Sequence, residues 1–271
     1  MIRIGASTAN LYPLETERAL DCLLELGFRE LEVFLNTESE AEETFIRRLR
    51  ARADEAGAVI RSVHPYLSGT EPYLLFSAYH RRYEDGLKNY RRLFRAAQLL
   101  GASYVVMHGD KREGVLPVEE SIACFEGVYD LGRTYGVTLL QENVVRFRAG
   151  DPAYVAAMRR QLGDKAGFVF DIKQCLRSGH TPDAMLDAMG DALVHVHISD
   201  HDTTHDCLMP GAGTMDYGPL FARLLHQQFS GSVMLELYRS NYEAETELIS
   251  GRKYLETVLH DEEIRFRDGH T

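Results

Sequence analysis

Four short apolar segments of this sequence each end in a residue that can bind a metal ion. The clearest segment, residues 193–200, reads Leu-Val-His-Val-His-Ile-Ser-Asp, and its two histidines lie two positions apart. In a β-strand both imidazoles would therefore point to the same side. The other three segments end in a carboxylate. Together the segments provide four candidate metal ligands, which are Glu142, Asp171, His197 and Glu236.

Carboxylate oxygens and an imidazole nitrogen suit one divalent cation. These donor types do not identify the ion as Mn²⁺, Zn²⁺, Co²⁺ or Mg²⁺. Two more predicted strands end at a histidine, His64 and His108. If all these ends meet, six charged or polar groups converge, which favours a metal site because isolated charges are costly in a semi-enclosed pocket. His64 and His108 would be further ligands or would orient a substrate. We interpret His195, one layer below His197, as a hydrogen-bonded core histidine.

The segments that must position these residues alternate between strand and helix patterns along the whole chain. We predict strands at residues 2–6, 30–35, 58–63, 103–107, 137–142, 167–171, 193–200 and 232–236. We predict helices at residues 14–26, 38–55, 72–100, 117–135, 152–162, 181–188, 219–228 and 242–259. No linker or low-complexity segment interrupts this alternation.

Eight strand–helix units predict an α/β fold with a single (β/α)8 TIM barrel, and one domain over residues 1–271. An open, doubly wound sheet would be the competing fold, but no glycine-rich phosphate loop follows the first strand. In a barrel all six candidate residues would lie at the C-terminal ends of the strands, which is where barrel enzymes place their active sites.

The composition is that of an ordinary globular protein, with 45% hydrophobic and 26% charged residues. The net charge of −11 argues against a large nucleic-acid surface, so we expect no nucleic-acid partner. The four cysteines form no CxxC pair, which favours neither a disulfide framework nor a zinc ribbon. No run has the length of a membrane span, and no apolar signal core begins the chain. We therefore expect a cytoplasmic protein without membrane contact, and we leave a homo-oligomer open.

The sequence resembles the xylose-isomerase-like TIM-barrel superfamily, which contains sugar isomerases, ketose 3-epimerases, inosose dehydratases and apurinic-site endonucleases. The matching elements occur in family order over nearly the whole chain. They are Glu142-Asn143, Asp171, the His-x-x-Asp of residues 197–200, the Pro-Gly-Ala-Gly of residues 210–213, and Leu235-Glu236. The resemblance implies that Glu142, Asp171, His197 and Glu236 bind one divalent ion.

Two departures from the family pattern bear on function. Members often carry a histidine three residues after the sixth-strand aspartate, where this chain has Gln174, and many carry a glutamate in the Gly-x-Gly loop, where it has Ala212. The endonuclease branch uses that histidine with an Asp-x-His segment to hold a third zinc. Those loop positions fall on His205 and Cys207, so the aspartate is missing. We therefore predict no third metal here, and DNA repair becomes the minority interpretation.

We predict a divalent-metal-dependent isomerase or epimerase that acts on a small sugar, a sugar phosphate or a polyol-derived ketone. The metal would hold adjacent substrate oxygens and stabilise an enediolate, while Glu142 and Glu236 remove and return the proton. A metal-dependent dehydratase of an inosose-like substrate is close to this chemistry. An endonuclease-like phosphodiester hydrolase and a non-catalytic sugar-binding barrel also stay open, because many functions share one fold.

Five side chains are candidates for binding the small-molecule carbohydrate substrate: His64, His108, Lys173, Gln174 and Arg239. Lys173 would reach a substrate oxygen or phosphate, although a solvated loop lysine explains it equally well. Arg239 would hold an anionic group, although arginines at a barrel rim are commonly solvated.

Overall fold

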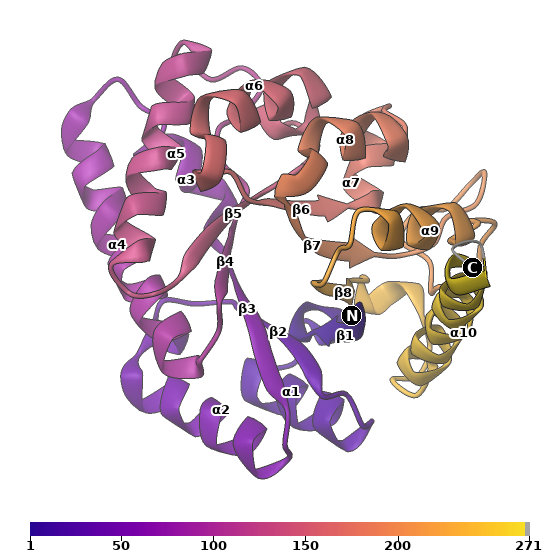
Figure 1. The fold of residues 1–271 in the computed structure, drawn as a ribbon. Helices are drawn as coiled ribbons and strands as arrows, with labels where there is room; N and C mark the ends of the chain where they lie inside the picture. Colours follow the sequence, from indigo (N-terminus) through magenta and orange to yellow (C-terminus); the bar gives the residue numbers. More distant parts are fainter. Residues whose placement is uncertain (269–271) are drawn as a thin grey trace.

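The computed structural model describes residues 1–268, in which eight parallel strands form a closed barrel in sequence order (Figure 1). The strands are β1 (Arg3–Ser7), β2 (Glu30–Leu35), β3 (Val59–Pro65), β4 (Tyr104–Met107), β5 (Thr138–Glu142), β6 (Phe168–Asp171), β7 (Leu193–Ile198) and β8 (Ser232–Leu235). β1 pairs with both β2 and β8, so the sheet has no open edge. This confirms the predicted TIM barrel and excludes the doubly wound sheet. The predicted domain, residues 1–271, includes three residues outside the described part.

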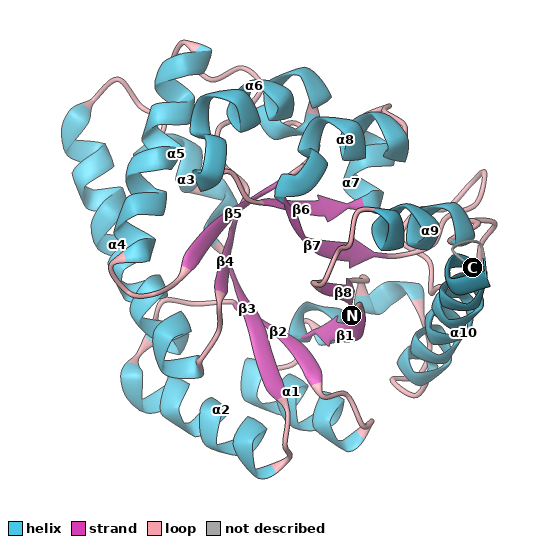
Figure 2. Ribbon diagram, viewed as in Figure 1, coloured by secondary structure: helices cyan, strands magenta, loops and turns pink. Residues whose placement is uncertain are grey.

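Helices lie around the outside of the strands (Figure 2). They are α1 (Thr16–Glu25), α2 (Glu43–Glu55), α3 (Glu71–Leu74), α4 (His80–Leu100), α5 (Val118–Arg133), α6 (Pro152–Leu162), α7 (Ile172–Arg177), α8 (Pro182–Met189), α9 (Gly218–His226) and α10 (Glu247–Asp268). Local sequence sets several ends: α4 stops at Gly101, whose φ of 72° is left-handed, and Thr181 caps α8. None of the helices in residues 1–268 is long and apolar enough to cross a membrane.

Several helices differ from the sequence prediction, among them α10, which spans Glu247–Asp268 where residues 242–259 were predicted. The region predicted as one helix over residues 72–100 is divided into α3 and α4, because residues 75–79 leave the helical path. The short helix α7 was not predicted, and it begins directly after β6 with the side chain of Asp171 as its N-cap. Lys173 consequently lies in a helix and is buried, instead of being solvated in a loop.

The barrel has two distinct buried regions. Outward-facing strand residues pack against the helices in one large apolar core, to which Val196 and Val233 belong. Inside the barrel, Val106, Leu140 and Val169 form a separate small apolar cluster. The remaining inner positions include buried polar side chains, and these lead up to the C-terminal rim.

Candidate metal centre

The four predicted ligands come together at the C-terminal ends of β5 to β8. One donor atom from each of Glu142, Asp171, His197 and Glu236 lies within 4.8 Å of the others. His197 Nδ1 lies 3.1 Å from Glu142 Oε1 and 3.4 Å from Glu236 Oε2. The side chains converge because parallel strands in a closed barrel all end at the same rim.

Asp171 is fixed from two directions. Its Oδ1 accepts a hydrogen bond from the backbone N–H of Gln174 at 2.8 Å, which starts α7. The side chain of Asn143 donates to the Asp171 carbonyl at 2.9 Å and accepts from the Asp171 N–H at 2.7 Å. Oδ2 is buried and accepts no hydrogen bond from any residue in the described range. This oxygen therefore offers a lone pair to a cation.

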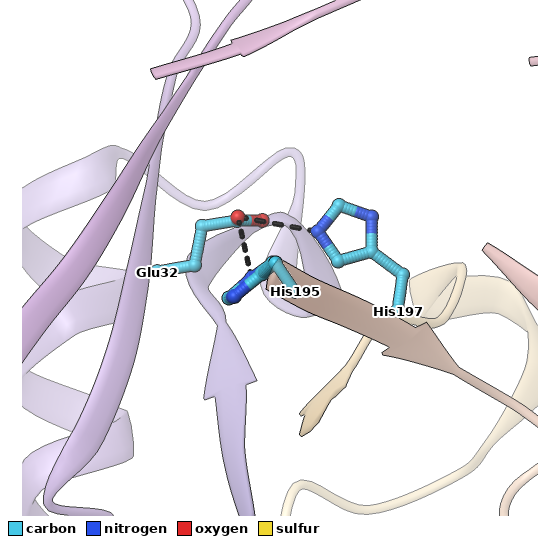
Figure 3. Close-up of side chains that lie close together, drawn as sticks. All are labelled: Glu32, His195 and His197. Atoms are coloured by element: carbon cyan, nitrogen blue, oxygen red, sulfur yellow. Dashed lines mark hydrogen bonds and ion pairs between the residues drawn. The ribbon is translucent and has the colours of Figure 1, made fainter. Parts of the chain in front are cut away.

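Glu32, on β2, lies beneath His197 and was not predicted as a site residue. Its Oε2 lies 3.2 Å from His197 Nε2 and 3.4 Å from His195 Nε2 (Figure 3). The same oxygen accepts a 2.7 Å hydrogen bond from the Ser62 hydroxyl. Burial by itself raises the pKa of Glu32, but His197, His195 and His64 together outweigh it and hold the pKa well below its usual range. His195 is buried and hydrogen-bonded, as predicted.

This arrangement determines which nitrogen of His197 can bind a metal. Nε2 faces Glu32, and Nδ1 faces Glu142 and Glu236. A carboxylate that accepts the second N–H of a metal-binding histidine fixes the ring orientation and increases the basicity of the free nitrogen. Glu32 therefore has the position of such an orienting carboxylate.

His64 and His108 lie on the other side of Glu142. Their Nε2 atoms are 3.4 Å and 3.2 Å from Glu142 Oε2, while Glu142 Oε1 faces His197. Burial lowers the pKa of His64, but the surrounding carboxylates together outweigh it, and the pKa is raised. His64, His108 and Glu142 form a second group with the geometry to hold a cation. Both predicted roles, ligand and substrate contact, remain predictions.

Lys173 approaches the centre from α7. Its Nζ lies 3.1 Å from Glu236 Oε2 and 3.4 Å from Asp171 Oδ2. Burial raises the pKa of Glu236, but Lys173 and His197 lower it to about 2. Burial raises the pKa of Asp171 to about 7 in spite of Lys173. One ammonium thus contacts two of the four candidate ligands.

Gln174 and Arg239 use their side chains elsewhere. Gln174 Oε1 accepts a hydrogen bond from the Val145 N–H at 3.1 Å and so holds the segment after β5. Arg239 donates to the carbonyls of Tyr242 and Glu243 at 2.8 Å and 3.0 Å, and so holds the segment after β8. Within residues 1–268, neither side chain forms a hydrogen bond or an ion pair with the carboxylates of the four candidate ligands. Gln174 contacts Asp171 through its backbone N–H. Their roles in substrate binding remain predictions without a supporting contact.

In the loop that was predicted to hold no third metal, His205 and Cys207 each contact other residues. His205 is exposed, and its ring lies 3.2 Å from the Asp202 carboxylate. Cys207 is buried with its Sγ 3.7 Å from the Glu236 carbonyl. The potential metal groups formed by residues 1–268 do not include His205 or Cys207.

The donor set fits a divalent cation. Glu142, Asp171 and Glu236 provide carboxylate oxygens, and His197 provides a nitrogen whose ring is already oriented. Asp171 Oδ2 is buried and accepts no hydrogen bond from the described residues, and Lys173 Nζ lies 3.4 Å from it, so this oxygen is available to a cation at closer range. Fold and site together define a TIM barrel with a candidate metal centre at its C-terminal rim.

Comparison with known proteins gives the family. Residues 20–258 match the xylose isomerase-like TIM barrel family, and the chain belongs to it. An uncharacterized protein of Mycobacterium leprae is 27% identical, over 96% of this chain and 98% of its own. Among solved structures, an L-ribulose 3-epimerase has a TM-score of 0.82 at 18% identity, over 100% of this chain and 99% of its own. A D-psicose 3-epimerase with D-tagatose from Clostridium cellulolyticum H10 has a TM-score of 0.78 at 16% identity, over 95% and 98%.

Proposed function

We propose that this protein is a divalent-metal-dependent isomerase or epimerase of a small sugar, a sugar phosphate or a polyol-derived ketone. The observation that carries the proposal is the placement of two glutamates around one imidazole nitrogen. Glu142 Oε1 and Glu236 Oε2 lie 3.1 Å and 3.4 Å from His197 Nδ1, with Asp171 in the same group. The structural similarity to an L-ribulose 3-epimerase and a D-psicose 3-epimerase supports a carbohydrate substrate.

The two glutamates perform the proton transfer. Glu142 and Glu236 come from β5 and the end of β8, so they approach a substrate between them from different sides of the ring of strands. One removes the proton from the substrate carbon, and the other returns it. When bound, one divalent cation supplies positive charge that stabilises the enediolate form of a ketose. His64 and His108 hold Glu142 from outside, so that its other oxygen faces the centre.

Replacing each glutamate separately tests this mechanism. We expect Glu142→Gln and Glu236→Gln to keep the fold and a reduced affinity for metal, and to lose about 10²–10⁴-fold in turnover because the base is removed. Activity is measured by NMR as solvent deuterium uptake at carbon with a panel of ketoses and inososes. Asp171→Asn is the matched comparison: it should mainly weaken metal binding, and excess metal should partly restore its activity. Wild-type turnover by both glutamine variants at saturating metal would contradict the mechanism.

A second function, phosphodiester hydrolysis with two metals, is favoured by one observation. His64, His108 and Glu142 form a second potential metal group that shares Glu142 with the first. Metal content separates the two functions: one ion per chain supports the isomerase, and two ions bridged by Glu142 support the hydrolase. Products of the same NMR assay identify a dehydratase, because loss of water gives a different compound.

A further inference from the structure

Lys173 occupies the part of the centre that a metal ion would share. It is the second residue of α7, two positions after Asp171, and its side chain is only 4% exposed. Its Nζ contacts Glu236 Oε2 and Asp171 Oδ2 at 3.1 Å and 3.4 Å. Glu236 Oε2 is also the oxygen that lies 3.4 Å from His197 Nδ1. The ammonium and the metal-facing imidazole nitrogen therefore approach the same carboxylate oxygen.

The charges of the centre explain why an ammonium lies there. Four carboxylates are nearly or fully buried around His197: those of Glu32, Glu142, Asp171 and Glu236. Carboxylates withdrawn from water destabilise the fold unless a cation or hydrogen bonds compensate them. Among the lysines and arginines of residues 1–268, the ion pairs of these four involve Lys173 alone. Its charge compensates Asp171 and Glu236 when no metal is bound.

We propose that Lys173 is a resident counter-ion whose ammonium competes with a divalent cation for Asp171 and Glu236 and thereby lowers the affinity of the centre for that cation. The proposal rests on the metal centre of the proposed function but not on its sugar chemistry. A cation bound between the carboxylates must share Glu236 Oε2 with the ammonium or displace it. Sharing brings two positive charges close together in a buried site, and displacement costs the ammonium its contacts with Asp171 and Glu236.

A second position for the displaced ammonium is already present. Nζ lies 5.0 Å from the ring centroid of Tyr238, which is 45% exposed and follows β8. An aromatic face attracts an ammonium, so Lys173 keeps one favourable contact if it moves toward Tyr238 and the rim. Arg177 also lies against this ring, 5.3 Å from its centroid, and its charge is paired with Asp206. The positive charge then lies between the metal ligands and solvent, where a substrate would enter.

A purely structural role of Lys173 predicts the opposite change in metal affinity. If Lys173 only held Asp171 and Glu236 in place, its removal would loosen the ligands and weaken metal binding. If it competes, its removal strengthens metal binding. The sign of the change in metal affinity separates competition from a purely structural role.

The test is calorimetric titration of metal-free protein with Mn²⁺, at one pH, for wild type, Lys173→Met and Lys173→Gln. Methionine keeps the length of the side chain, and glutamine keeps a hydrogen-bond donor if methionine prevents folding. Lys165→Met is the control, because Lys165 pairs with Glu126 and Asp130 on the surface. We expect the Lys173 variants to bind Mn²⁺ about tenfold more tightly or better, and Mn²⁺ to raise their Tm by more than that of wild type. Lys165→Met should match wild type.

Equal or weaker Mn²⁺ binding by folded Lys173 variants would overturn the proposal that Lys173 competes with the metal ion. Absence of Mn²⁺ binding in every protein, wild type included, would overturn both this proposal and the metal centre of the proposed function. Tighter binding by the variants, together with no conversion of any sugar by wild type, would support the counter-ion and count against the isomerase alone.

Discussion

Two neighbouring regions inside the barrel are equally buried and have opposite chemistry. Val106, Leu140 and Val169, from β4 to β6, form an apolar cluster. Glu32 and His195, from β2 and β7, belong to a hydrogen-bonded polar group with Ser62 of β3. The two regions touch, since Val169 pairs in register with His195. Apolar side chains fill such a space without a desolvation penalty, whereas a buried carboxylate needs partners. We infer that the apolar region stabilises the barrel and the polar region orients His197.

Truncating the apolar region should give the largest effect on stability. We expect Leu140→Ala to lower the free energy of unfolding by about 2–5 kcal/mol, because it leaves a cavity among side chains that cannot close around it. Its affinity for a divalent cation should stay within about twofold of wild type, since Leu140 belongs to the apolar cluster and not to the group that orients His197. Urea unfolding and calorimetric metal titration measure the two quantities. A fall in metal affinity as large as the loss of stability would remove the distinction between the regions.

Removing the charge of Glu32 from the polar region should have a smaller effect on the free energy of unfolding. It should act mainly on the metal affinity of the candidate centre. Glu32→Gln keeps the volume of the side chain but removes the charge that faces His197 Nε2 at 3.2 Å. We expect metal affinity to fall about 10–100-fold, as for other carboxylates that support a metal-binding histidine. Leu140→Ala serves as the control in the same titration. Unchanged affinity in Glu32→Gln would mean that Glu32 does not orient the ligand.

The smallest effect is expected at the edge of the polar region. Ser62→Ala removes the 2.7 Å hydrogen bond to Glu32 Oε2 and the 3.4 Å hydrogen bond with His195 Nε2. It leaves both histidine contacts of Glu32 in place. We expect a loss of about 1 kcal/mol in unfolding free energy and no more than about a threefold loss of metal affinity. Thermal unfolding and the same titration measure both. A loss of metal affinity equal to that of Glu32→Gln would show that the serine, and not the charge, is decisive.

The sequence allowed the barrel and the convergence of the four candidate ligands to be predicted, because both follow from periodic patterns. Strand–helix alternation gives the fold, and residues at the ends of parallel strands must meet at one rim. Glu142 and Asp171 end their strands, His197 is the last residue but one of β7, and Glu236 directly follows β8. Their proximity therefore needed no knowledge of packing.

Glu32 could not be predicted in this way, because it does not lie at the end of a strand. It is 165 residues from His197, and it lies within β2 and not at its end. Glu30 lies two positions earlier in the same strand and forms an ion pair with Arg61. The pairing of β2 with β3 shifts by one residue between Leu31 and Glu32, because Arg61 of β3 is left without a pairing partner in β2, and this shift places Ser62 opposite Glu32 without a local sequence signal. A carboxylate inside an apolar strand was the available hint.

Asp171 limits where this protein can acquire new substrate preferences. The same side chain ends β6, caps α7 and faces the candidate metal centre, so no residue can be inserted between strand and helix without losing one of these roles. The connection after β7 is different, because a long segment separates Ile198 from Gly218 at the same rim. Evolution of specificity in related barrels should therefore alter the connection after β7 in length and sequence, and leave the junction at Asp171 unchanged.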